Sequence, residues 1–209
     1  MDYQDRDAVE KHEISSETKN QKNMPKSALA YLHDLVCLLA GILLVFSLLF
    51  RVVVVSGASM NDTLVHGDWI LLLGNGLYGE PKYGDIIVAS KDSFKNGEPI
   101  IKRVIATEGQ TVDIDFNAGI VYVDGVALEE PYTLTPTNLM EGVSFPLTVD
   151  EGCIFVMGDN RNESRDSRSD MIGLIDCREV LGKAIFLIFP GMDDDHPERE
   201  FGRIGVLAQ

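Results

Sequence analysis

A serine in a glycine-containing segment is the first candidate for chemistry in this chain. Ser59 lies in the segment Ser56-Gly57-Ala58-Ser59-Met60, which follows a run of valines at positions 52–55. A serine hydroxyl becomes a useful nucleophile only when a neighbouring base removes its proton. The small residues before Ser59 would let a substrate backbone approach closely. By itself such a segment is usually a turn, so a catalytic interpretation needs a second residue.

Lys102 is the candidate for that base. It lies in the otherwise apolar stretch Ile100-Ile101-Lys102-Arg103-Val104-Ile105. In a β-strand Lys102 and Arg103 point to opposite sides, so at least one of them faces a covered surface. Burial disfavours the ammonium and brings a lysine pKa from about 10.4 towards the ~7–8 that suits a general base. The plainer alternative is a lysine on a strand edge, with its ammonium in water.

A dense polar segment is the third candidate. Residues 158–168 read GDNRNESRDSR and follow the apolar run CIFVM at 153–157. Its interleaved Ser, Asp and Arg side chains can form charge-assisted hydrogen bonds, and a hydroxyl beside a neutral lysine would fix the direction of its lone pair. We therefore expect this segment to support a catalytic pair rather than to supply it. The alternative is an ordinary solvent-exposed turn.

The three segments, with Gly84-Asp85-Ile86-Ile87-Val88 between the first two, have the order and spacing typical of type I signal peptidases. The chain resembles this family over roughly residues 35–190, and GDNRxxSxDSR is a highly specific motif. The resemblance implies a membrane-anchored serine endopeptidase that removes signal peptides from exported preproteins through an acyl-enzyme. It also implies that the enzyme uses no metal and no cofactor.

By this resemblance Ser59 is the nucleophile and Lys102 the general base. The backbone N–H of Ser59 would donate to the oxyanion, whereas a second donor stays open because Gly57 stands where family members carry a serine. Supporting roles fall to residues of the polar segment, with Ser164 positioning Lys102: Asp159, Ser164, Asp166 and Arg168. Shallow pockets for small substrate side chains are expected from apolar residues: Val54, Met60, Ile100 and Ile101.

The chain departs from the family pattern in its loops. Asp62 occupies a position commonly held by proline, and Thr107-Glu108 replace a common Leu-Pro. Both changes concern local shape more than chemistry. The acidic ending, residues 193–209, matches no family motif and carries no predicted role.

Residues 35–50 form an uncharged apolar run of 16 residues, about 24 Å as a helix against a bilayer core of roughly 30 Å. With Arg51, whose charge would snorkel, and the valines at 52–55, the run reaches roughly 32 Å. A buried core helix and a cleaved secretory signal are the alternatives. The organisation we expect is a polar tail over residues 1–34, a transmembrane anchor over 35–55 and a peptidase domain over 56–209.

Charge around this run predicts its orientation. Lys19, Lys22 and Lys26 precede it, whereas only Arg51 directly follows, which places the N-terminus in the cytoplasm and the catalytic residues outside. Two N-glycosylation acceptor patterns, at 61–63 and 162–164, fall inside the candidate site, where glycans would obstruct a substrate. We take both as accidental and expect a bacterial plasma membrane.

Beyond residue 60 the pattern is one of short apolar runs broken by Gly, Pro, Asp and Asn, without alternating helices. This predicts a mainly β fold, with an antiparallel β-rich catalytic domain and one N-terminal transmembrane helix. Residues 120–128 are expected to form a hairpin, since Asp124-Gly125 suits a tight two-residue turn. The other expected strands cover residues 69–73, 85–90, 100–107, 111–116, 153–157 and 180–189.

Composition limits the partners. A net charge of −15 argues against nucleic acid, which binds clustered Lys and Arg. The expected partners are signal peptides of exported preproteins and the lipid bilayer, and the protein translocation machinery stays open as a third. The cysteines, Cys37, Cys153 and Cys177, are too few and too scattered for a disulfide framework or a zinc site, and pairing of the last two stays open.

Three other functions compete with this interpretation. His66 would be the base of a histidine-dependent protease, although a loop residue is the simpler interpretation. Another membrane-tethered Ser–Lys protease ranks next; self-cleaving repressors share this architecture, but the chain shows no helix-turn-helix pattern. The last is a non-catalytic β-domain that binds leader peptides, which turnover of a peptide would distinguish.

Overall fold

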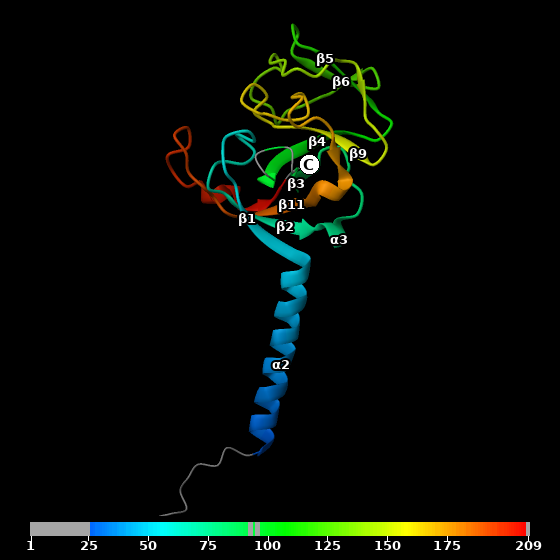
Figure 1. Cartoon of the computed structure of the whole chain (residues 1–209). Helices are drawn as coiled ribbons and strands as arrows, with labels where there is room; N and C mark the ends of the chain where they lie inside the picture. The colour runs from blue at the N-terminus through cyan, green and yellow to red at the C-terminus, as the bar shows by residue number, and fades with distance from the viewer. Residues whose placement is uncertain (1–25, 92–93, 95–96, 208–209) are drawn as a thin grey trace, which may run out of the picture. The chain divides into compact units, whose positions relative to one another are not determined.

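The structure, a computed structural model, describes residues 26–91, 94 and 97–207 (Figure 1). The predicted N-terminal tail therefore lies mostly outside the described residues. The chain divides into two compact units, one up to Val45 and one from Phe46 onwards. Among the described residues, the second unit holds all of the sheet structure and is the one that carries the candidate site.

Helix α2 (Lys26–Leu49) is long and apolar enough to cross a membrane. Its segment Ala28–Leu49 has 22 residues and a mean hydropathy of 2.4, and none of its side chains is buried in the protein. At 1.5 Å per residue this segment is about 33 Å long. An apolar helix that is exposed all round requires apolar surroundings, so α2 fits a single-pass membrane protein.

The end of this helix corrects the predicted anchor. The sequence analysis extended the span through Arg51 to residue 55, but the helix ends at Leu49 and Phe50–Val54 form strand β1. Val52 pairs with Leu71 and Val54 with Trp69 in the neighbouring strand. The β-branched valines favour this extended conformation, whereas the apolar helical segment begins at Ala28, before the predicted start of the anchor.

The second unit is mainly antiparallel β, which confirms the predicted fold class. Its large sheet has the order β1-β2-β11-β3-β4-β9-β10, and β12 pairs with β11. The strands that the sequence predicted at 69–73, 85–90, 100–107, 153–157 and 180–189 are all present. The bounds are β1 (Phe50–Val54), β2 (Trp69–Gly74), β3 (Ile86–Ala89), β4 (Ile100–Thr107), β9 (Cys153–Met157), β10 (Ile175–Asp176), β11 (Val180–Phe189) and β12 (Gly205–Val206).

A small sheet with the order β7-β6-β5-β8 lies apart from the β2-β11-β3 region (Figure 1). The hairpin predicted at 120–128 is confirmed, because β6 pairs with β7 across Asp124 and Gly125, both with positive φ. Its strands are β5 (Thr111–Asp115), β6 (Ile120–Val123), β7 (Val126–Ala127) and β8 (Leu147–Thr148). The short helices in the part of the unit that the structure describes are α3 (Asn75–Tyr78), η2 (Cys177–Glu179) and η3 (Phe201–Arg203).

The core consists of three apolar clusters, separated by the alternation of side chains along the strands. On β3, Val88 belongs to the first cluster and Ile87 to the second. On β4, Val104 belongs to the second cluster and Ile105 to the third, which also takes in the small sheet. Both β3 and β4 are therefore covered on both faces, and a charged residue in the middle of β4 has to be buried.

The cysteine pairing left open by the sequence does not occur in the structure. Cys153 and Cys177 are both free thiols. Cys153, on β9, packs against the third cluster, and Cys177, the first residue of η2, packs against the second.

Candidate active site

Ser59 lies on the loop that joins β1 to β2. The nucleophile loop, as we call residues 56–68, is closed at its neck by hydrogen bonds from Val55 N to Asp68 O (2.8 Å) and from Gly67 N to Val55 O (2.9 Å). Gly57 has a φ of 94°, a conformation that glycine adopts at little cost. The serine is half-buried. Its backbone carbonyl accepts a hydrogen bond from Asn160 N at 3.1 Å, which ties the loop to the polar segment.

Lys102 lies opposite Ser59, in the middle of β4. Its Nζ donates to Ser59 Oγ at 2.7 Å and to Ile101 O at 2.9 Å. The side chain is almost fully buried, with 4% exposed. Burial lowers the pKa of Lys102 to about 8, even though nearby carboxylates, first of all Asp166, act to raise it. The structure thus brings the two predicted residues into hydrogen-bond contact, and burial shifts the lysine towards its neutral form.

Arg103 points to the other side of β4 and is buried as well. Its guanidinium forms a bidentate ion pair with Asp159, at 2.9 Å and 2.7 Å, and lies 4.0 Å from the centre of the Tyr132 ring. Asp159 also accepts a hydrogen bond of 2.5 Å from Thr63 Oγ1, in the nucleophile loop. The predicted supporting residue Asp159 therefore joins the strand that carries Lys102 to the loop that carries Ser59.

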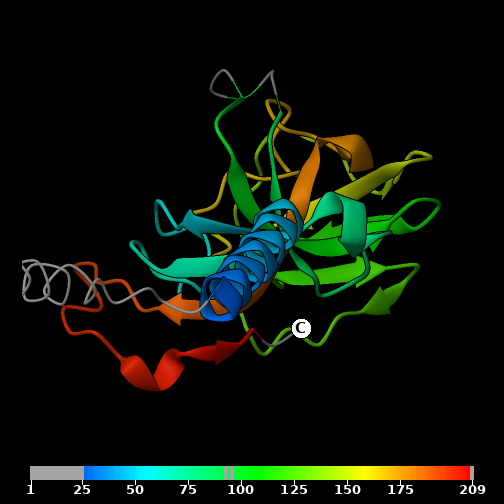
Figure 2. The same cartoon turned by 90° about the horizontal axis from the view of Figure 1, so that it is seen from below.

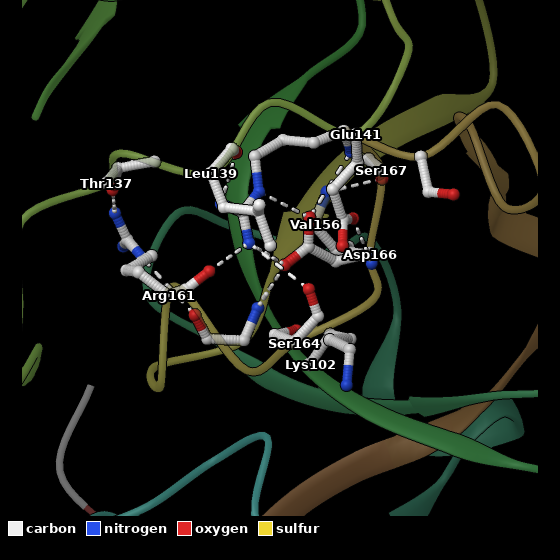
Figure 3. A network of polar contacts seen from close by, with 12 residues as sticks. Lys102, Thr137, Leu139, Glu141, Val156, Arg161, Ser164, Asp166 and Ser167 are labelled. Carbon is white, nitrogen blue, oxygen red and sulfur yellow. Dashed lines mark hydrogen bonds and ion pairs between the residues drawn. The ribbon is translucent and has the colours of Figure 1, made fainter. Parts of the chain in front are cut away.

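The polar segment after β9 is a buried network rather than an exposed turn (Figure 3). Arg168 pairs with Asp166 through two hydrogen bonds of 2.8 Å and donates to Arg161 O at 2.6 Å. Burial by itself raises the pKa of Asp166, but the hydrogen bonds from Arg168 and from Gly158 N outweigh it and hold that pKa below its usual value. The ion pair between Asp166 and Arg168 keeps the segment closed on itself.

Ser164 is placed beside Lys102 (Figure 3), but the expected hydrogen bond between them is not formed. Its Oγ is buried and has no hydrogen-bond partner in the described part of the chain. It lies against Gly158, where a Cβ would come within 2.2 Å of it. Any larger residue at position 158 would displace the Ser164 hydroxyl, which explains the glycine.

A cavity of about 700 Å³ opens over the pair. Its lining includes Ser59, Lys102 and Ser164 together with every residue predicted to shape the substrate pockets: Val54, Met60, Ile100 and Ile101. Three of the predicted supporting residues do not line the cavity and can act on the pair only through the segments that they hold: Asp159, Asp166 and Arg168. Sequence reasoning missed Glu141, which lines the cavity from a segment held against the polar network by a hydrogen bond from Val143 N to Arg168 O.

His66 does not contact Ser59. Its side chain is exposed, and its Nδ1 accepts a hydrogen bond from the backbone N–H of Gly57 at 3.2 Å. This contact occupies one backbone donor near the site, so the Gly57 N–H is not free to serve as the second oxyanion donor. Within the described ranges, no group of three or more His, Cys, Asp or Glu side chains is arranged to hold a metal ion.

Comparison with known proteins bears on this geometry. The family model described as "Signal peptidase, peptidase S26" matches residues 28–189. The chain belongs to the signal peptidase family. It is similar to a signal peptidase I from Bacillus licheniformis, with 38% identity over 156 residues, 71% of this chain and 81% of that protein.

Two further relatives carry signal peptidase names. A probable signal peptidase I-1 from Synechocystis sp. is 38% identical over 160 residues, covering 70% of this chain and 78% of the relative. A crystal structure of a signal peptidase I from Enterococcus faecalis has 31% identity and a TM-score of 0.43, and covers 51% of this chain and 97% of that one. The signal peptidase match ends at residue 189, so the whole segment after β11 lies outside it.

Proposed function

We propose that this chain is a membrane-anchored serine endopeptidase that removes signal peptides from exported preproteins, with Ser59 as nucleophile and Lys102 as general base. The observation that carries the proposal is the 2.7 Å contact between Lys102 Nζ and Ser59 Oγ. It lies in the wall of an open cavity, in a member of the signal peptidase family. Proximity of a nucleophile to a base of lowered pKa is the requirement for serine activation.

The reaction is acyl transfer. Neutral Lys102 accepts the hydroxyl proton of Ser59 while Oγ attacks the scissile carbonyl carbon, and the Ser59 N–H donates to the developing oxyanion. The resulting lysine ammonium gives its proton to the leaving amine as the peptide bond breaks. Lys102, neutral again, takes a proton from the water that attacks the acyl-enzyme. As the ester bond breaks, the lysine ammonium returns this proton to Ser59 Oγ, and the leader leaves with a free carboxylate.

The cavity supports cleavage after small residues. Its apolar walls, formed by Val54, Met60, Ile100 and Ile101, suit short side chains of an extended leader. β1 ends the strand order of the large sheet, so one edge of it is unpaired within the described residues. An extended peptide can add to such an edge through main-chain hydrogen bonds.

The helix supports a membrane location for the same activity. With lysines at 19, 22 and 26 ahead of the apolar segment Ala28–Leu49, the N-terminus belongs in the cytoplasm and the catalytic unit on the outer side of a bacterial plasma membrane. A leader peptide emerging there would be the substrate, the lipid bilayer the second partner, and the protein translocation machinery a third to be tested. A reporter fused to each end of the chain would test the orientation.

The decisive experiment is cleavage of a leader-bearing preprotein by the full chain in detergent. Wild type should cut after a small-x-small segment, and Ser59→Ala and Lys102→Ala should lose nearly all turnover while keeping the β circular dichroism signal. Ser144→Ala and Lys82→Ala, at exposed positions outside the cavity, are matched controls that should retain activity. Turnover by folded Lys102→Ala would refute the mechanism, and an inactive wild type would favour a leader-binding domain.

A further inference from the structure

The segment that follows β11 packs against the nucleophile loop, although it matches no family motif. In β11, Phe189 pairs with Trp69 of β2, and Trp69 directly follows the nucleophile loop. Residue 190 therefore emerges beside residue 68. Figure 1 shows this red segment beside the cyan loop after β1, and Figure 2 shows it running along the outside of the sheet. We call residues 191–203 the C-terminal clamp.

The clamp begins with a contact between two backbones. Gly191 is buried, and its N–H donates to Asp68 Oδ1 at 2.6 Å. A Cβ on Gly191 would come within 2.1 Å of His66 O and 2.5 Å of Asp68 N. No side chain fits between the two segments, so residue 191 must be glycine for the clamp to reach the loop.

Arg203 closes the clamp at its other end. Its guanidinium forms a bidentate ion pair with Asp68, at 3.1 Å and 2.7 Å, and also donates to Thr63 O at 3.3 Å. Asp68 is completely buried and in addition accepts from Val65 N at 2.8 Å. One arginine therefore joins the neck of the nucleophile loop to its middle, a geometry that the planar fork of a guanidinium allows and an ammonium does not.

A further contact lies two residues from the nucleophile. Buried Asn61 donates from Nδ2 to Asp193 Oδ2 at 3.2 Å. His196 lies between two carboxylates, 3.0 Å from Asp193 and 3.4 Å from Asp62. The nucleophile loop is also held to the polar segment by two hydrogen bonds, one from Thr63 to Asp159 and one from Asn160 to Ala58 O. The segment that carries Ser59 is thus bound by hydrogen bonds both to the polar network and to the clamp.

We propose that the C-terminal clamp is a positioning element for catalysis, with Arg203 as the positioning residue that keeps Ser59 Oγ within hydrogen-bond reach of Lys102. This inference rests on the proposed function of Ser59. Arg203 does not itself line the cavity, so its loss acts on the nucleophile through the loop that it holds. Misplacement of a reacting group by about 1 Å can cost on the order of 100-fold in rate.

The test compares Arg203→Met and Arg203→Lys in the full chain in detergent, with a leader peptide as substrate. For Arg203→Met we expect kcat to fall by roughly 10- to 100-fold with KM within about threefold of wild type. Arg203→Lys keeps a cation beside Asp68 but cannot bind both Asp68 oxygens and Thr63 O, so its kcat should be intermediate. Arg178→Met removes an exposed arginine paired with Asp176 and is the matched control.

Two readouts separate positioning from general loss of structure. The rate of single-turnover acylation should fall with kcat at temperatures well below the unfolding midpoint of each variant. The pH at which activity rises should stay where it is, because Lys102 remains buried. If Arg203→Met does not fold, the comparison rests on Arg203→Lys.

The outcomes are distinguishable. A kcat within twofold of wild type in a folded Arg203 variant overturns the clamp proposal, as does a fall explained entirely by the unfolded fraction. If Ser59→Ala is inactive in the same assay, such a result leaves the proposed function intact. Full turnover by Ser59→Ala overturns both proposals.

Discussion

Arg103 and Asp159 form a bidentate ion pair in which the arginine side chain is 2% exposed and the aspartate 0%. The pair lies on the side of β4 opposite to Lys102, and Asp159 also accepts a hydrogen bond from Thr63 of the nucleophile loop. Taking two charges out of water is costly and is offset only when both partners are present. The pair is therefore a single structural unit on which the site depends.

Removing one partner of this pair should be far more harmful than removing both. We expect Arg103→Met to lower the free energy of unfolding by roughly 3–5 kcal/mol, because it leaves the Asp159 carboxylate buried without its cation. Replacing Asp159 as well, with Leu, should restore part of that loss. Denaturant unfolding followed by circular dichroism measures both variants. Equal stability of the single and double variants would contradict this account.

The pH dependence follows from Lys102. Its pKa is lowered to about 8, first by burial, and the active form is the neutral amine. The value of kcat/KM should therefore rise about tenfold per pH unit below pH 8 and level off above it, because protonation removes the base as the pH falls. Initial rates between pH 6 and 10, on a substrate without titratable groups near the scissile bond, give the profile. A flat profile from pH 6 to 8 would exclude Lys102 as the base.

Glu141 offers a way to shift that profile. Its negative charge is one of the factors that raise the pKa of Lys102 against the effect of burial. Glu141→Gln removes the charge and keeps the shape, so the rise in kcat/KM should move to lower pH. The exposed substitution Glu129→Gln is a control of equal charge change at a position outside the cavity. A shift to higher pH, or an equal shift in both variants, would show that Glu141 does not act on Lys102.

Ser164 should separate activity from stability. A buried hydroxyl without a partner costs about 1–3 kcal/mol, so Ser164→Ala should leave the thermal midpoint unchanged or raise it. If the hydroxyl turns towards Lys102 during the reaction, the same variant should lose about tenfold in kcat. Thermal unfolding and leader cleavage on one preparation measure both. An unchanged kcat would show that the Ser164 hydroxyl has no role in turnover and that this side chain contributes only packing.

Much of the site followed from local pattern. Ser59, Lys102 and the polar segment could be found because each lies in a short stretch of sequence, and the order and spacing of these stretches resemble the signal peptidase family. The strand alternation around Lys102 also predicted burial, and the structure buries both Lys102 and Arg103. The hairpin at Asp124-Gly125 is local in the same sense, since two positive-φ residues are sufficient to turn the chain.

The helix end at Leu49 shows where local pattern is insufficient. The valines after Phe50 are apolar enough to continue a membrane span, and hydropathy does not distinguish a span from a strand there. Pairing with β2 decides in favour of the strand, because it satisfies the backbone groups of residues 50–54 that face β2. That partner lies beyond the nucleophile loop and is not visible within the run itself.

The contacts of Arg203 and Asp68 depend entirely on tertiary structure. These residues are 135 positions apart and meet only because β11 inserts between β2 and β3 in the large sheet. Glu141 reaches the cavity in a similar way, through a segment held by the polar network. Residue types and spacing thus specify which groups can react, whereas strand order specifies which distant groups hold them, because ion pairs and packing act through space and leave no periodic signal along the chain.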